Sequence, residues 1–159
     1  EIIYDVFDLT KRSINDNISI NMDLNAKDPI FNGEPNQIQN AIINIILNAK
    51  DAMPEGGKLF ISTSNIFLDR EFLRSFKANI LSGNYILLAI EDTGIGIEDS
   101  IKPRIFEPFF TTKDIGKGTG LGLACVYGVM EYHRGLVTAE SESGKGTKFC
   151  LYFPVSELY

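Results

Sequence analysis

The segment that most restricts the fold is residues 38–53, which are apolar on almost every side of a helix. The apolar positions in it are Ile38, Ala41, Ile42, Ile43, Ile45, Ile46, Leu47, Ala49 and Met53. Pro35 suits the first position of a helix, and Pro54 with the following glycines marks a turn. Because a helix that is apolar all round is normally buried, we predict a core helix that ends near Met53.

Four polar side chains interrupt this apolar helix along one face. Asn40, Asn44, Asn48 and Asp51 follow one another at spacings of four, four and three, which stacks them on a single side. Buried amides and carboxylates are costly unless they are hydrogen-bonded, so the row either bonds to neighbouring backbone or lines a polar site. One asparagine alone favours the first reading, but a whole row favours a site. Amide oxygens are ligands that suit Mg²⁺.

The rest of the chain alternates between strand and helix patterns. Strands are predicted at residues 18–24, 29–32, 58–65, 85–91, 136–142 and 147–154, and helices at 2–15 and from 123 to about 135. Residues 67–83 read as a polar connection with some helical character, and residues 92–122 as a long functional or mobile loop. We predict one domain over residues 1–159, an α/β sandwich whose mixed sheet is covered by helices on one face.

Two glycine clusters flank the long loop. The first, EDTGIGI at 91–97, follows the apolar strand, so Asp92 lies at a strand end where its carboxylate can accept bonds from an amine. The second, GKGTGLGL at 116–123, opens a helix whose free N–H groups favour phosphate. Either cluster alone is equally compatible with a structural turn. The sequence has no P-loop, no dinucleotide-binding glycine motif and no protein-kinase motif.

Composition excludes several classes of protein. The net charge of −6 argues against a nucleic-acid binder, which needs clustered Lys and Arg. No apolar run reaches the ~18 residues of a membrane helix. Cys125 and Cys150 lie among apolar neighbours, so we expect two reduced core thiols and a cytoplasmic domain, with the option that it is the cytosolic part of a membrane-anchored sensor.

Taken in order, these motifs resemble the ATP-binding domain shared by sensor histidine kinases, gyrase, MutL and heat-shock chaperones. NIILNAKDAM (44–53) resembles the asparagine box and DTGIG (92–96) the first glycine box. RIFEPFFTTK (104–113) is similar to the phenylalanine box of histidine kinases, GTGLGL (118–123) to the second glycine box, and GKGT (144–147) to the terminal turn. The resemblance implies a Bergerat-type two-layer sandwich, a mostly antiparallel sheet with about three helices, and a long ATP lid.

The resemblance also implies a role for each matching position. ATP contacts are expected at Asn44, Asn48, Asp51, Asp92, Gly94, Gly96, Ile97, Phe106, Thr112, Lys113, Gly118, Thr119, Gly120, Leu121, Gly122, Leu123 and Thr147. Asp92 would bind the adenine amino group, assisted by Thr147 through water. Asn44 and Asn48 would hold Mg²⁺ and the phosphates. Asn44 and Lys113 are the expected catalytic residues, and Lys117 is a second lysine within reach of the phosphates; a solvated-loop reading stays open for both lysines.

Two positions depart from the family pattern. Asp51 stands where many histidine kinases have Lys or Arg, which resembles a nitrogen-regulator-like subgroup and leaves Lys113 to supply the positive charge. His133, the only histidine, precedes Arg134 after the last helix, where the family often has His-Gly. We expect His133 to be a structural residue and not a phosphoacceptor.

The implied function is phosphoryl transfer from Mg-ATP to a histidine on a separate dimerisation domain. Asn44 stands where the ATPases of this superfamily carry a glutamate base, and an amide cannot take a proton from water. The alternatives are an ATPase or serine kinase of the same superfamily, and a non-catalytic nucleotide-binding docking module. Residues 68–85 resemble an insertion of hybrid sensor kinases, so a receiver domain after Tyr159 or a separate response regulator is an expected partner. The full-length protein is expected to be a homodimer and this chain a monomer.

Overall fold

The protein is described by a computed structural model, which places residues 1–155. Its helices are α1 (Ile2–Thr10), α2 (Pro35–Ala52), α3 (Arg70–Ser75) and α4 (Gly122–Tyr132), with a 3-10 turn η1 (Lys102–Arg104). Its strands are β1 (Ile18–Leu24), β2 (Gly57–Leu68), β3 (Gly83–Asp92), β4 (Leu136–Glu142) and β5 (Gly146–Pro154). Every predicted helix and every predicted strand except one is present in this set.

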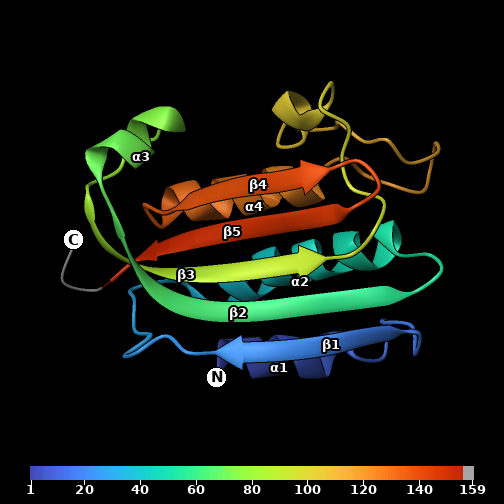
Figure 1. The fold of residues 1–159 in the computed structure, drawn as a ribbon, viewed down its shortest axis with the longest axis horizontal. Helices are drawn as coiled ribbons and strands as arrows, with labels where there is room; N and C mark the ends of the chain where they lie inside the picture. Colours follow the sequence, from blue (N-terminus) through green and yellow to red (C-terminus); the bar gives the residue numbers. More distant parts are fainter. Residues whose placement is uncertain (156–159) are drawn as a thin grey trace.

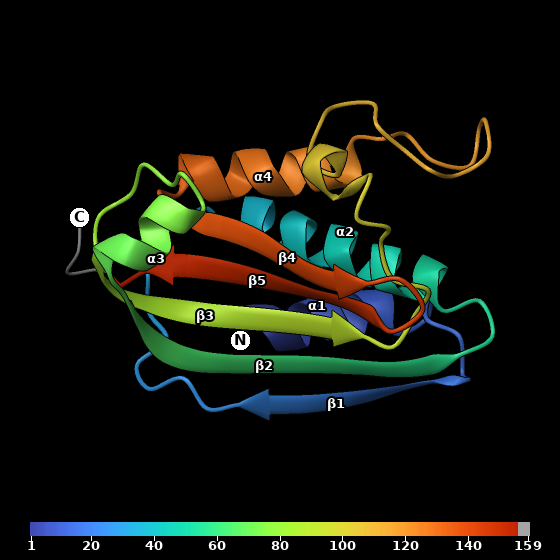
Figure 2. The same cartoon turned by 45° about the horizontal axis from the view of Figure 1, so that its top comes forward.

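The strands form one mixed sheet, in the order β1-β2-β3-β5-β4. The β1–β2 pair is parallel and the other three pairs are antiparallel. Helices α1, α2 and α4 lie together behind the sheet, as Figures 1 and 2 show from two directions. The prediction of a two-layer α/β sandwich with a mixed, mostly antiparallel sheet is therefore confirmed.

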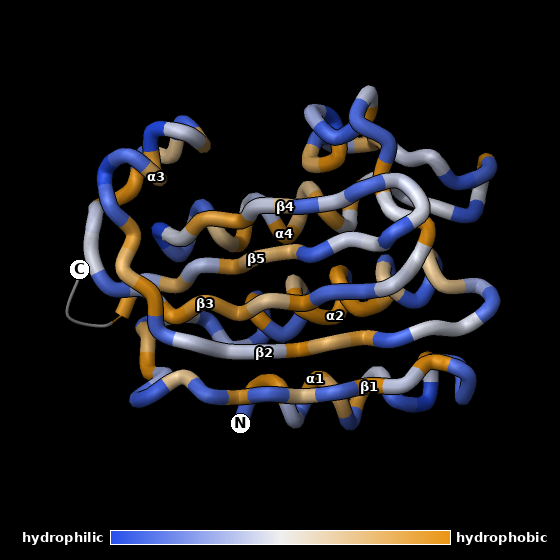
Figure 3. The backbone as a smooth tube through the Cα atoms, viewed as in Figure 1, coloured by the Kyte–Doolittle hydropathy of each residue, from blue (hydrophilic) through white to orange (hydrophobic). Residues whose placement is uncertain are grey.

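The core lies between the sheet and these helices. Ile42, Ile45 and Ile46 of α2 are almost fully buried, and they share one cluster with Ile90 of β3 and Leu151 of β5. Burial of each such side chain contributes about 1.5–3 kcal/mol. In Figure 3 the apolar colouring follows the strands and α2, whereas the turns and much of the lid are hydrophilic. The apolar helix predicted from the sequence is thus the centre of the core.

The opposite face of the sheet is partly covered by the connection between β2 and β3. Asp69 caps α3 by accepting a bond from the Phe72 N–H at 2.8 Å. Leu73 of α3 joins a second apolar cluster with Tyr85 and Tyr152. This connection is the segment that resembles the hybrid-kinase insertion, and here it shields one end of the second face.

Two local predictions are wrong. Residues 29–32 form no strand, because Asp28 takes a positive φ of 47° and Phe31 instead stacks on Phe153 at 4.6 Å. The first helix stops at Thr10 and does not reach Asn15, since the chain turns there with the Ser13 and Ile14 N–H groups bonded to the Thr10 carbonyl.

The cysteine prediction is half correct. Cys150 is buried in the second cluster, but Cys125 is exposed on the outer face of α4. Between residues 1 and 155, no helix is long and apolar enough to cross a membrane.

Candidate nucleotide-binding site

A cavity of about 720 Å³ lies between α2, the start of α4, the ends of β3 and β5, and the lid. The lid is the segment 98–121, which contains η1 and extends beyond α4 in Figure 2. Asn44, Asn48 and Asp51 line the cavity from α2, and Asp92 and Thr147 line it from the sheet. The cavity therefore joins residues that are up to about a hundred positions apart in the sequence.

Asp92 lies at the deep end of this cavity. It is only 4% exposed, although it is the last residue of a strand. Its Oδ1 accepts the Gly94 N–H at 2.8 Å, and the backbone of Thr147 also bonds to the carboxyl group. Burial raises the pKa of Asp92, and the nearby Glu91 adds to the rise, while the two backbone bonds oppose it. A carboxyl group held this way is a fixed acceptor for an N–H group of a ligand.

The first glycine segment is wedged between α2 and the β4–β5 hairpin. A Cβ on Gly94 would overlap the Ala52 carbonyl of α2, and one on Gly96 would overlap the Glu142 carbonyl of β4. Gly96 also has a φ of +71°, which glycine adopts without strain. The Ile95 N–H donates to the Ala52 carbonyl at 2.9 Å. These glycines therefore hold the segment close enough to both neighbours to form a wall of the cavity.

The amide row of α2 enters the cavity only in part. Asn44 and Asn48 line it, but Asn40 is exposed and lies outside. Gly122, the first residue of α4, faces Asn44, since a Cβ on Gly122 would lie 3.7 Å from Asn44 Oδ1. Within the described chain, no side chain caps the start of α4. Its first N–H groups and the amide oxygens of α2 thus meet at one place, where a phosphate with its cation would find both kinds of partner.

Two contacts hold parts of the lid to one another, and a third joins the lid to α2. The Phe109 N–H donates to the Gly120 carbonyl at 2.8 Å, and a Cβ on Gly120 would overlap Phe109 backbone. Arg104 stacks over the Phe110 ring at 4.4 Å. Lys113 forms an ion pair with Asp51 of α2. The lysine expected to reach the phosphates therefore lies at the cavity, held by the acidic residue that departs from the family pattern.

All but three of the predicted ATP contacts line the cavity. Gly94 does not, because it faces α2. Phe106 does not, because it packs against Tyr127 and Phe149. Leu121 points outward from the start of α4 and is exposed. These three residues shape or flank the wall and do not form it.

Other residues line the cavity although they were not among the predicted ATP contacts, and most of them lie within the motifs. They are Leu47, Ala49, Ala52, Ile95, Ile101, Ile105, Phe110, Thr111, Gly116, Lys117 and Phe149; of these only Lys117 was expected near the nucleotide, as a second lysine within reach of the phosphates. Leu47 and Ala52 had a signal, since they follow Asn44 and Asn48 at helical spacing. Phe149 had none, because it lies in a strand that only the sheet order brings beside Asp92.

His133 is buried and fully engaged. Its Nδ1 lies 2.7 Å from the Val129 carbonyl, and its Nε2 accepts the Glu34 N–H at 2.9 Å. The ring therefore carries its proton on Nδ1 and joins the end of α4 to the start of α2. It is structural, and it lies by a separate cavity of about 390 Å³ near Arg134 and Pro154.

The cavity fits a nucleotide with a cation. Its volume is within the range of about 300–1,000 Å³ typical of ligand sites, with acceptors at the deep end and a helix N-terminus with amide oxygens at the other. Among residues 1–155, no group of three or more His, Cys, Asp or Glu side chains is placed to hold a metal alone. Mg²⁺ typically keeps several waters and binds through few protein ligands together with substrate phosphates, and the amide oxygens of Asn44 and Asn48 are ligands of a kind that it accepts.

The family model described as histidine kinase-, DNA gyrase B- and HSP90-like ATPase matches residues 33–157. Sporulation kinase E of Bacillus subtilis is 37% identical over 99% of the chain and 19% of its own length. Sensor kinase CckA of Brucella abortus is 42% identical over 74% of the chain and 12% of its own length. The sensor histidine kinase ZraS of Escherichia coli is 32% identical over 80% of the chain and 24% of its own length.

The solved structures agree with these relatives. The catalytic domain of histidine kinase ThkA is 26% identical, with a TM-score of 0.77 over 98% of this chain and 91% of that one. Full-length ShkA in complex with AMPPNP is 23% identical and shares the fold, with a TM-score of 0.76 over 98% of this chain and 29% of that one. The chain spans less than a quarter of the length of the three curated relatives. It belongs to the histidine kinase-, gyrase B- and HSP90-like ATPase family, as a catalytic ATP-binding domain homologous to those of sensor histidine kinases in two-component signalling.

Proposed function

We propose that this domain binds Mg-ATP in the 720 Å³ cavity and transfers the γ-phosphoryl group to a histidine on a separate dimerisation domain. Phosphoryl transfer depends mainly on positioning and charge neutralisation, and it needs little covalent help from the protein. Asp92 and Thr147 would bind the base, Asn44 and Asn48 would hold the cation and phosphates, and Lys113 would leave Asp51 for the terminal phosphate. The acceptor histidine lies elsewhere, since His133 is buried with both nitrogens bonded.

The buried Asp92 carboxyl group carries this proposal. Burial of a carboxylate at the deep end of a cavity costs folding free energy, and groups perturbed in this way cluster at functional sites. We expect calorimetric titration with an ATP analogue and Mg²⁺ to show saturable binding. Asp92→Ala should weaken it by about tenfold or more, as expected for a hydrogen bond to a charged group. Omitting Mg²⁺ should weaken binding of the wild-type chain. A folded chain that binds no nucleotide would instead favour a docking module without catalysis.

The amide side chain of Asn44 distinguishes a kinase activity from an ATPase activity. Since an amide is no general base, we expect the isolated chain to hydrolyse ATP far more slowly than one turnover per second, a typical lower bound for enzymes. The same chain should phosphorylate a supplied helical dimerisation domain that carries a histidine, and not its His→Ala variant. Rapid hydrolysis that depended on Asn44 would make the domain an ATPase, and transfer to serine would make it a serine kinase.

The relatives' greater length supports a multidomain setting. We propose that the full-length protein is a homodimer with its own phosphoacceptor domain, that it passes the phosphoryl group to a receiver domain or response regulator, and that this domain works in the cytoplasm, where ATP is available. Size-exclusion chromatography with light scattering should find this chain monomeric.

A further inference from the structure

Three residues lie side by side across three neighbouring strands at the deep end of the cavity. Ser141 of β4 pairs with Thr147 of β5, and Thr147 pairs with Asp92 of β3. Asp92 and Thr147 line the cavity, whereas Ser141 stands one strand behind them. Ser141 belongs to none of the motifs that point to the site.

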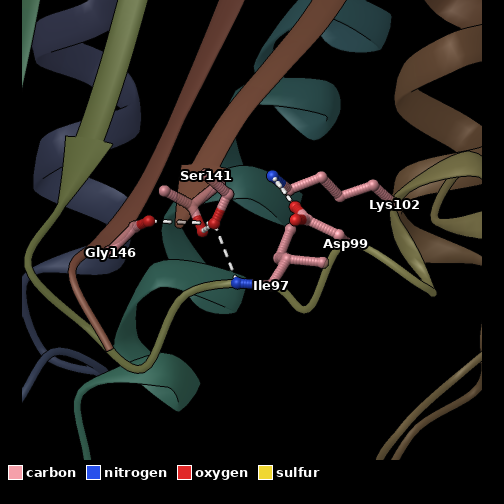
Figure 4. Close-up of polar contacts among 6 residues, drawn as sticks. Ile97, Asp99, Lys102, Ser141 and Gly146 are labelled. Carbon is pink, nitrogen blue, oxygen red and sulfur yellow. Dashed lines mark hydrogen bonds and ion pairs between the residues drawn. The ribbon is translucent and has the colours of Figure 1, made fainter. Parts of the chain in front are cut away.

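Ser141 Oγ makes three hydrogen bonds. It donates to the Gly146 carbonyl at 2.9 Å, accepts the Ile97 N–H at 2.8 Å, and lies 2.8 Å from Thr147 Oγ1. Figure 4 shows Ser141 between Gly146 and Ile97, with dashed lines to both. A hydroxyl group has one proton and two lone pairs. Because the Gly146 carbonyl can only accept, it takes the Ser141 proton.

This count settles the direction of the remaining bond. With its own proton committed, Ser141 can only accept from Thr147, so the Thr147 hydroxyl donates to Ser141. The Thr147 proton therefore points away from the cavity, and its free lone pairs are left for a ligand. Asp92 beside it is also an acceptor, since its carboxyl group accepts the Gly94 N–H and a backbone bond from Thr147.

We propose that Ser141 is a positioning residue that fixes Thr147 as an acceptor, so that the site selects purine nucleotides with a 6-amino group against those with a 6-oxo group. A water that bridges Asp92 and Thr147 to the base would give the same preference for an amine. A water that donates one proton to Asp92 and one to Thr147 has only lone pairs left, so it accepts from an amine and has nothing to donate to a carbonyl oxygen. The inference rests on the proposed nucleotide binding.

Ser141→Ala releases the Thr147 hydroxyl, which then rotates and donates toward the base or the water. We measure the ratio of the dissociation constants of IDP and ADP by calorimetry, with thermal unfolding as the check on folding. The ratio should fall by about three- to tenfold, the value of one neutral hydrogen bond. Ser141→Thr, which keeps the hydroxyl, should retain the wild-type ratio. Ser143→Ala, in the exposed hairpin turn, is the matched control and should leave the ratio unchanged.

If the role of Ser141 is merely structural, Ser141→Ala should lower the affinity for both nucleotides alike. The ratio of the two dissociation constants would then stay unchanged, and the inference would be overturned. Thr147→Val keeps it testable if Ser141→Ala does not fold. If the Thr147 hydroxyl accepts, this variant lowers the affinity for ADP and leaves the affinity for IDP unchanged. A larger loss of affinity for IDP would mean that the hydroxyl donates, and the inference would fail. A folded wild-type chain that binds neither nucleotide removes the proposed function as well. If the chain prefers ADP and neither the Ser141 nor the Thr147 variant changes that preference, nucleotide binding stands and only the role of Ser141 is removed.

Discussion

At the scale of single residues, Asp92 links burial to ligand binding. Its raised pKa has desolvation as the main cause, so the folded protein holds a proton on this group more readily than the unfolded chain does. The folded state is therefore favoured by this group as the pH falls through the raised pKa, and that advantage is lost as the pH rises. The affinity for the ligand depends on pH in the opposite direction, because the adenine amine needs the ionised acceptor and binds better as the pH rises.

We therefore predict that affinity for ADP falls on acidification, beginning above the pH range in which an ordinary aspartate titrates. Asp92→Asn is the control, because its side chain has no proton to gain. Any pH dependence that it shares with the wild type comes from other groups, such as the phosphates of ADP. The measurement is calorimetric titration of both proteins at several pH values. Parallel curves for the two proteins would show that Asp92 does not titrate in the site.

Gly122 and Gly96 are predicted to respond in opposite ways to alanine. Gly122→Ala should leave stability unchanged or raise it by at most about 1 kcal/mol, because its Cβ has room in a helix. It should nevertheless weaken nucleotide binding, since the methyl group enters the space before Asn44. Gly96→Ala should destabilise the fold by several kcal/mol, roughly the cost of strain together with a clash. Urea unfolding and calorimetry check both, and a Gly122→Ala chain that unfolds early would contradict this division.

At the scale of elements, the lid and α2 are joined by the Lys113–Asp51 ion pair. The two side chains are 35% and 45% exposed, so the pair adds only about 0–1 kcal/mol to stability. Yet it holds the lysine away from a ligand. We predict that Asp51→Asn raises affinity for an ATP analogue by roughly two- to fivefold, consistent with the release of a weak pair.

Lys113→Met should lower the preference for ATP over ADP, because it removes a charge that only the terminal phosphate would attract. Lys11→Met is the matched control, since Lys11 pairs with Asp8 of α1, both are well exposed, and neither lines the cavity. Calorimetry with ATP analogue and ADP gives the ratio for each variant. Equal ratios for wild type and Lys113→Met would place Lys113 outside phosphate binding.

At the scale of the whole molecule, the two thiols report separately on surface and core. Burial raises the pKa of the Cys150 thiol, while Cys125 lies exposed on α4. We predict that a thiol reagent labels one cysteine in the native protein and two in denaturant, since reaction requires an accessible thiolate. Mass spectrometry identifies the site, and Cys125→Ser should abolish native labelling. Fast native labelling of Cys150 would mean that the second face of the sheet opens.

Much of the architecture followed from local patterns. The apolar helix, the period-two strands and the glycine clusters are short-range features, and each produced the element expected of it. Residues 29–32 did not, because Asp28 takes a positive φ and Phe31 stacks on Phe153, which lies more than a hundred positions further along the chain. A short apolar segment cannot reveal such long-range partners.

The sequence alone determined which motifs this protein carries, because Asp92, the amide row and the glycine clusters are recognisable from chemistry and spacing. The tertiary structure decided how they meet. The order β3-β5-β4 sets Ser141 beside Thr147 and Thr147 beside Asp92, although β4 precedes β5 in the chain. The lid fold brings Lys113 to Asp51 across 62 positions. Hydrogen-bond direction and ion pairing depend on distances of a few ångströms, and only the packed chain establishes those.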